Sequence, residues 1–140
     1  MRLHRYNQTL LNRPARLTNK HGFLLIAEIG EEAKFDLAAL QELAALKPNA
    51  RLWVQSNRCG KYRCLRLKPR TPGEPQNLMV ARIVAALDNR GPLSRQEVKH
   101  RNGNRWDFTA RNLVATGKTR CRGSDRTHEI VAHWRLEEGK

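Results

Sequence analysis

The chain has little of what membrane or secreted proteins need. Its apolar runs, such as Leu24 to Ala27 and Val84 to Leu87, are far shorter than the roughly 20 residues of a transmembrane helix. The three cysteines are an odd number and too sparse for a disulfide scaffold. No apolar segment follows the charged start from Met1 to Asn7, so we expect no secretory signal. These absences favour a cytoplasmic protein with free thiols and no membrane span.

Acidic residues are scarce beside basic ones. The 140 residues include 13 Asp and Glu against 27 Lys and Arg, a formal net charge of +14. Binding to a polyanion relieves such self-repulsion, and nucleic acid is the usual polyanion for a chain of this kind. A merely basic surface is the plainer alternative. Aromatic residues make up only 6% of the chain, which argues against a protein that binds single strands by stacking bases.

The length and the hydrophobic fraction of 39% fit one compact α+β domain over residues 1–140. We expect a strand, a helix and a basic hairpin in residues 1–68. Residues 76–140 are expected to hold a helix, a motif region and a tail. The Pro-rich stretch from Pro69 to Pro75 is too short to mark a domain boundary.

The N-terminal third contains one predicted strand and one predicted helix. Arg2 to Lys20 shows no firm period and is interpreted as an arm on DNA or an irregular edge. Phe23 to Ile29 is a short apolar run closed by Gly30, which predicts a buried strand. Asp36 is a good N-cap, and the apolar residues at helical spacing after it predict a helix that Pro48 ends.

A basic hairpin is predicted next. Arg51 to Ser56 and Lys61 to Lys68 have the pattern of two strands, and Asn57 to Gly60 supplies the turn. Basic residues alternate roughly with apolar ones, so one face would meet the core and the other would carry Arg and Lys. Such a ribbon has about the width that enters a major groove. An ordinary solvated sheet face is the equal alternative.

Two further helices are predicted from periodicity. Asn77 to Arg90 has its apolar residues on one side and ends at Gly91 and Pro92. Gly117 to Asp125 is a polar, glycine-broken loop. Thr127 to Glu138 is predicted to be a final helix that turns three side chains inward, namely Ile130, Val131 and Trp134.

Between these helices, Glu97 to Thr116 has the sequence EVKHRNGNRWDFTARNLVAT. This segment of 20 residues resembles the HNH motif of phage-type and intron-encoded endonucleases. In that motif a strand ends in a histidine, a turn and loop follow, and an Asn-Leu pair opens a second strand. His100 and Asn112 stand at the family's separation of twelve residues. The resemblance implies a C-terminal ββα-metal element.

The same resemblance implies roles for these residues. The histidine is the general base that activates water, and an imidazole with a pKa near neutrality suits that task. Asn112 would hold His100 in one tautomer by bonding to the ring or to backbone beside it. Gly103 permits the positive φ that reverses the chain. Asp107 matches an Asp or Asn of the family loop and is expected to form internal hydrogen bonds.

The resemblance also implies a divalent metal, magnesium or manganese, and here the match is imperfect. The residue before the histidine, usually a ligand, is Lys99, which does not ligate while protonated. The second usual ligand position falls on Arg120 or on Cys121, a soft thiolate that suits zinc better than magnesium. Asp125 and His128 are the candidate replacements. Without a working metal site, Lys99 and Arg120 would neutralise phosphate charge there. The protein would then be a former nuclease that binds DNA without cutting it.

Two further patterns, a possible zinc site and a second family resemblance, are less specific than the HNH-like motif. Cys59 and Cys64, with Cys121 and a distant histidine, are too scattered for a structural zinc, which is not expected. Arg51 to Lys68 followed by the helix from Leu78 to Leu87 resembles phage HNH proteins that carry a plant-transcription-factor-like, three-stranded DNA-binding sheet.

The leading expectation is a metal-dependent DNA endonuclease or nickase with His100 as base and double-stranded DNA as partner. A non-catalytic DNA-binding regulator or accessory protein on the same scaffold is the second. An RNA-binding, ribosome-associated protein is the third, and it explains the charge but not the motif. A phage origin would place the protein in the bacterial cytoplasm. The expected DNA contacts are Arg51, Lys61, Arg63, Arg66, Lys68, Lys99, Arg101, Arg105, Arg111, Lys118 and Arg120.

Overall fold

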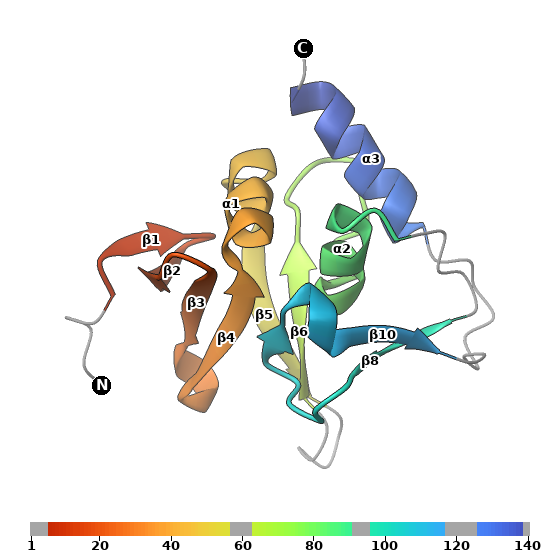
Figure 1. The fold of residues 1–140 in the computed structure, drawn as a ribbon. Coiled ribbons are helices and arrows are strands. Elements are labelled where there is room, and N and C mark those ends of the chain that lie inside the picture. Colours follow the sequence, from red (N-terminus) through yellow and green to blue (C-terminus); the bar gives the residue numbers. More distant parts are fainter. Residues whose placement is uncertain (1–5, 57–62, 91–95, 117–125, 139–140) are drawn as a thin grey trace.

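The computed structural model describes residues 6–56, 63–90, 96–116 and 126–138. Within these ranges, several small sheets and three helices form a mixed α+β fold (Figure 1), which confirms the expected class. None of the helices in these ranges is long and apolar enough to cross a membrane. The predicted hairpin turn and the loop after residue 116 lie outside the described residues, as do Lys61, Lys118, Arg120, Cys121 and Asp125.

Four antiparallel strands form most of the N-terminal sheet. They are β1 (Gln8–Leu10), β2 (Arg13–Leu17), β3 (His21–Ile26) and β4 (Glu31–Asp36). The expectation of an arm or irregular edge from Arg2 to Lys20 is therefore wrong over β1 and β2. Leu11 and Asn12 join these two strands with φ of 53° and 61°. Leucine is unusual in that conformation, so the sequence gives no turn signal there.

The predicted strand from Phe23 to Ile29 ends three residues early. Its last residues form a 3₁₀ turn, η2 (Ala27–Ile29), which Gly30 closes with a φ of 68°. The chain thereby reverses into β4, which was not predicted. In β4, Ala33 and Phe35 are buried while their neighbours are charged.

The fifth strand of this sheet comes from the HNH-like segment. β9 (Asp107–Phe108) pairs in parallel with β4 and sets Lys34 opposite Asp107 and Phe35 opposite Phe108. The two buried phenylalanine rings stack with their centroids 5.2 Å apart. The Lys34 N–H also donates to the Trp106 carbonyl oxygen at 2.7 Å. The N-terminal sheet thus extends into the loop that carries the predicted site.

A second sheet contains the basic hairpin. β5 (Arg51–Ser56) and β6 (Arg63–Lys68) are antiparallel, as predicted, and β7 (Leu78–Met79) adds a short third strand beside β6. Because these two residues of β7 join the sheet, the helix predicted from Asn77 begins only at Val80. It is α2 (Val80–Leu87), shorter at both ends than expected.

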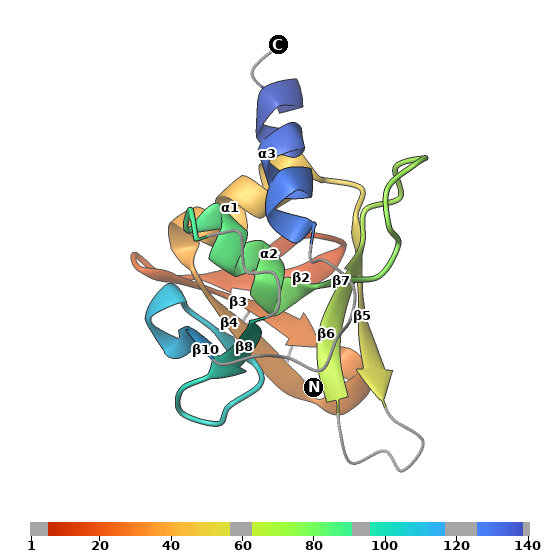
Figure 2. The same ribbon diagram turned by 90° about the vertical axis from the view of Figure 1, so that its right-hand side faces the viewer.

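Helix α2 occupies the middle of the molecule. All its residues except Arg82 are buried, so this part of the predicted helix is covered on more than the one apolar side that the sequence indicated. It contacts β6, β7, β9 and α3 (Thr127–Glu138). Figures 1 and 2 show it beside β6 and below α3. Helix α1 (Leu37–Leu46) packs on β3 and β4. Buried side chains from both halves of the chain form one hydrophobic cluster.

The last elements follow the predicted order. β8 (Glu97–His100) pairs with β10 (Leu113–Thr116) as an antiparallel hairpin, and a 3₁₀ turn, η3 (Ala110–Asn112), precedes β10. Helix α3 has the predicted bounds, with Val131 and Trp134 buried. It packs against α2 and α1. The Trp134 indole also donates to Glu74 at 2.8 Å, which ties the Pro-rich segment to this helix.

Candidate active site and nucleic-acid interface

His100 is the last residue of β8, and its partly buried ring meets Phe108 edge-on at 5.3 Å. Its Nδ1 lies 3.0 Å from the backbone oxygen of Asp107. A carbonyl oxygen only accepts hydrogen bonds, so this contact requires the hydrogen on Nδ1. The neutral ring then keeps its lone pair on Nε2, the nitrogen that a general base uses in this tautomer.

The surroundings favour the neutral form of this ring. Burial lowers the pKa of His100 below its ordinary value, and the positive charge of Arg105 acts in the same direction. The carbonyl and carboxylate of Asp107 oppose the shift without cancelling it. At neutral pH the imidazole is therefore uncharged and able to accept a proton.

Asn112 is buried, and its side-chain amide bonds to backbone groups near His100. Its Nδ2 donates to the Asp107 backbone oxygen at 3.0 Å, and its Oδ1 accepts from the Asn102 N–H at 3.0 Å. Of the two alternatives expected for Asn112, a bond to the ring or to backbone beside it, the structure has the bond to backbone. Asn112 positions the carbonyl that also receives the hydrogen of His100.

The Asp107 carboxylate ties the loop together, as predicted. It accepts hydrogen bonds from the Thr109 N–H and hydroxyl at 3.1 and 2.7 Å and from the Asn102 amide at 3.2 Å. Burial raises the pKa of Asp107, but these hydrogen bonds outweigh it and the net pKa is below the ordinary value. Gly103 turns the chain with a φ of 76°, and its N–H donates to the His100 oxygen. The carboxylate is therefore ionised and engaged within the loop.

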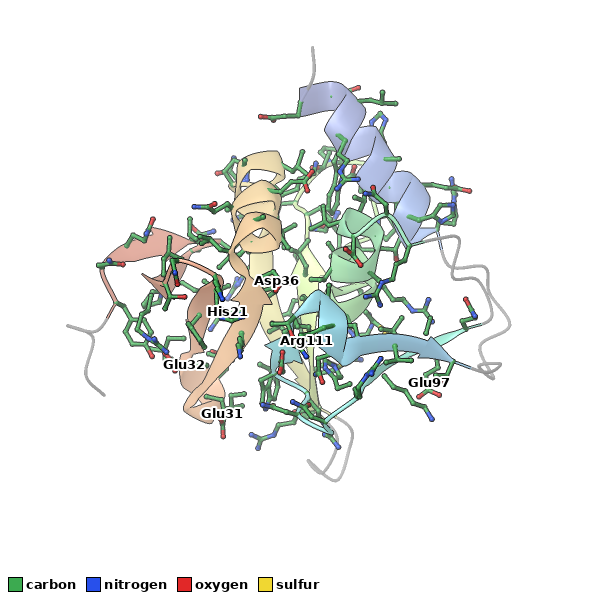
Figure 3. All side chains as sticks on the ribbon, viewed as in Figure 1. His21, Glu31, Glu32, Asp36, Glu97 and Arg111 are labelled. Atoms are coloured by element: carbon green, nitrogen blue, oxygen red, sulfur yellow. The ribbon has the colours of Figure 1, made fainter. Side chains whose placement is uncertain are left out.

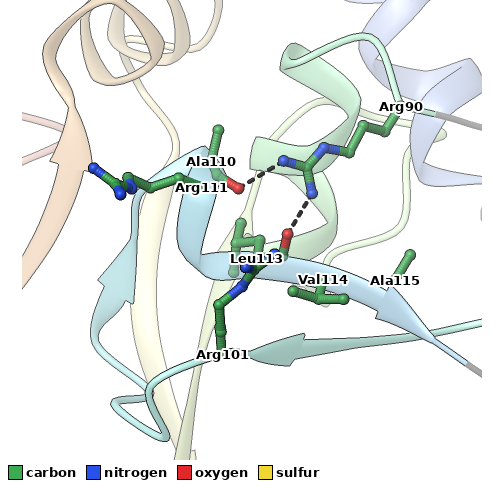
Figure 4. A pocket seen from close by; sticks show the side chains of 7 residues that line it. All are labelled: Arg90, Arg101, Ala110, Arg111, Leu113, Val114 and Ala115. Carbon is green, nitrogen blue, oxygen red and sulfur yellow. Dashed lines mark hydrogen bonds between the residues drawn. The ribbon is translucent and has the colours of Figure 1, made fainter.

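Two residues that sequence reasoning missed hold the turn η3. Asp36 Oδ2 accepts the Ala110 N–H at 2.8 Å. Arg90 donates to the carbonyl oxygens of Ala110, at 2.6 Å, and Leu113 (Figure 4). The sequence marked Asp36 as a helix cap and Arg90 as a last-turn residue. No local pattern indicated that either contacts the loop, because Asp36 lies 74 positions from Ala110.

The described residues do not complete a metal site with His100. They contain no group of three or more His, Cys, Asp or Glu side chains that could hold an ion. His128 lies in the first turn of α3 with its Nδ1 buried and unpartnered, and α3 packs on α2 and α1. The side chain of Lys99 is 60% exposed, and its Nζ lies 4.0 Å from Glu97 Oε2. Asp125, the other candidate ligand, lies outside the described residues.

A groove of about 460 Å³ runs beside β10 and is lined by three arginines. Arg101 and Arg111 are exposed, whereas Arg90 turns its guanidinium to the backbone (Figure 4). His100 is not part of its lining, but Arg101 follows His100 directly in the chain. The groove therefore carries two exposed cations, one of which, Arg101, is the chain neighbour of the candidate base.

The basic face of the second sheet lies next to the same loop. Arg51 is opposite Lys68 and Trp53 is opposite Arg66 in the register of β5 and β6. The leucines of these strands alternate with them and are buried, as the sequence pattern predicted. Arg105 of the loop donates to the Arg63 backbone oxygen at 3.4 Å. The loop and one end of the sheet are thus in contact.

Comparison of the chain with protein-family models, with curated proteins and with solved structures gives no match.

Proposed function

We propose that this protein binds double-stranded DNA and hydrolyses phosphodiester bonds as an HNH-type endonuclease or nickase, with His100 as the general base. The observation that carries this proposal is the hydrogen bond between His100 Nδ1 and the Asp107 backbone oxygen. It leaves Nε2 free of a hydrogen, and the lowered pKa keeps the ring neutral. A neutral imidazole in one tautomer is suited to take a proton from an attacking water.

The charge around His100 supports DNA as the substrate. Lys99, Arg101 and Arg111 are exposed, and cations so placed bind the phosphates on either side of a scissile bond. The face with Arg51, Arg66 and Lys68 would add phosphate and groove contacts along the duplex. A net charge of +14 provides long-range attraction for the same polyanion.

The resemblance to HNH nucleases includes a divalent metal that stabilises charge on the scissile phosphate. The hairpin of β8 and β10 followed by α3 has the order of a ββα-metal element. The described residues offer no complete ligand set, so the proposed mechanism is limited to proton transfer at His100 and phosphate binding by the arginines.

Supercoiled plasmid tests the proposal. Wild-type protein, His100→Ala and His133→Ala are incubated with magnesium, manganese or a chelator. His133 is the matched control because its side chain is 61% exposed on α3. We expect metal-dependent nicking by the wild type and by His133→Ala and none by His100→Ala. Equal nicking by His100→Ala would contradict the role of His100.

A non-catalytic DNA-binding regulator is the second candidate. The observation that favours it is the incomplete ligand set among the described residues, with exposed Lys99 in the position before the histidine. Under this alternative, wild type and His100→Ala both shift duplex DNA on a gel and neither cuts it. A preference for structured RNA over duplex DNA of equal length would instead support an RNA-binding protein.

A further inference from the structure

We infer that Asp36 and Arg90 are positioning residues for His100 and act through the turn η3. The inference gives the proposed general base its support, so its meaning for catalysis rests on the proposed function. The contacts that carry it are independent of that function. Asp36 and Arg90, which lie near the ends of two helices, bond to η3. Asn112 of η3 and His100 Nδ1 both bond to the Asp107 oxygen.

Asp36 does not cap α1 with its side chain, although its position suggests that it would. It stands at the N-cap position of α1 but forms no side-chain hydrogen bond to that helix. The first N–H of α1, on Leu37, donates to the Lys20 carbonyl oxygen at 3.0 Å. The Asp36 carboxylate accepts the Ala110 N–H at 2.8 Å in place of a cap bond to its own helix. The first N–H groups of a helical turn have no partner within it, and a carboxylate satisfies them well.

Arg90 contacts both ends of the same turn. Its Nη1 and Nη2 donate to the carbonyl oxygens of Leu113 and Ala110, and its Nε donates to Asp88 at 2.8 Å. Hydrogen bonds from a charged donor are stronger than those between neutral groups. The guanidinium in the groove is thus occupied with the backbone, unlike the exposed Arg101 and Arg111.

The held turn carries the asparagine of the motif. Asn112 ends η3, and its side chain donates to the Asp107 oxygen that also receives the hydrogen from His100 Nδ1. If η3 shifts, this carbonyl loses one of its fixing contacts and the ring is no longer restricted to one tautomer. The pairing of β9 with β4 is the second restraint on Asp107, so we expect partial loss of the tautomer preference and not loss of the fold.

The test is ¹⁵N NMR of histidine-labelled protein at a pH where the imidazoles are neutral. Wild type should show His100 with its hydrogen on Nδ1. In Asp36→Ala, His100 should become a mixture of tautomers, and Asp36→Asn should restore the wild-type pattern because the amide oxygen still accepts. Glu31→Ala is the matched control, since Glu31 is exposed at the other end of β4 (Figure 3).

Arg90→Met and Arg90→Lys form a second pair for the same measurement. Arg90→Met should mix the tautomers, and Arg90→Lys, which keeps a donor, should show less mixing. The signals of His21 and His133 report in each spectrum whether the fold is intact. A single Nδ1–H tautomer for His100 in folded Asp36→Ala and folded Arg90→Met would overturn the inference.

Plasmid nicking separates this inference from the proposed function. Asp36→Ala should lower the maximal nicking rate by about 10- to 100-fold with DNA affinity unchanged. If wild type does not nick but the tautomers respond as described, the proposed function fails and the positioning stands. If wild type nicks, while Asp36→Ala keeps both the rate and the tautomer, the positioning fails and the function stands.

Discussion

The loop around His100 and the outer face of the second sheet use polar residues in opposite ways. In the loop, the side chains of Asn102, Asp107 and Asn112 bond to one another and to backbone. On the sheet, Arg51 and Lys68 are exposed and lie opposite each other in neighbouring strands. Buried polar groups that satisfy one another make a rigid site, whereas adjacent exposed cations gain from a polyanion. The loop is thus suited to chemistry and the sheet to binding.

Removing the asparagine of the loop should have the largest effect. Asn112→Ala removes the partner of the Asn102 N–H and leaves the Asp107 oxygen with His100 Nδ1 as its remaining donor. We expect a cost of about 2–3 kcal/mol of unfolding free energy and loss of nicking. Urea denaturation and plasmid nicking measure the two effects. Asn77→Ala, at an exposed position, is the control and should leave both unchanged. Full nicking by Asn112→Ala would show that the loop needs no such rigidity.

Neutralising the sheet face should affect binding but not stability. The double variant Arg51→Ala with Lys68→Ala removes about two phosphate contacts, so the slope of log affinity against log salt should decrease by about two. Its unfolding free energy should stay within about 0.5 kcal/mol of wild type. Titration of duplex DNA at several salt concentrations measures the slope. The double variant Lys20→Ala with Arg126→Ala removes two cations at exposed positions outside this sheet and controls for the loss of net charge. An equal effect there would show that the sheet has no special role.

The smallest expected effect is on the pH dependence of stability. The folded pKa of His100 lies below its ordinary value, so the folded protein binds fewer protons than the unfolded chain just below that value. The unfolding free energy should therefore fall as pH drops below about 6.5. Denaturation of wild type and His100→Gln across this range isolates the contribution. A steeper fall in His100→Gln than in wild type would reverse the sign and contradict the burial argument.

The sequence predicted elements whose signals are local. The alternation in β5 and β6, the periodicity of α3 and the Gly103 turn all depend on neighbouring residues, and the structure has them where expected. His100 at a strand end opposite Leu113 also agrees with the motif.

What the sequence could not indicate depends on distant partners. β9 is two residues long and exists because β4, more than 70 positions earlier, pairs with it. The turn of Leu11 and Asn12 has no glycine to announce it. Asp36 looks like a helix cap from its neighbours alone, and its partner in η3 appears only when the chain is folded. Long-range contacts therefore account for β9 and for the role of Asp36, whereas the turn between β1 and β2 was missed because its residues carry no turn signal.

The most direct test of the account is chemical rescue of His100→Gly in the plasmid nicking assay with magnesium or manganese. We predict that this variant binds duplex DNA like wild type, does not nick it, and regains part of the activity when imidazole is added to replace the missing base. Nicking by His100→Gly at the wild-type rate without imidazole would contradict the account. So would a wild-type protein that binds duplex DNA and never cuts it with either metal.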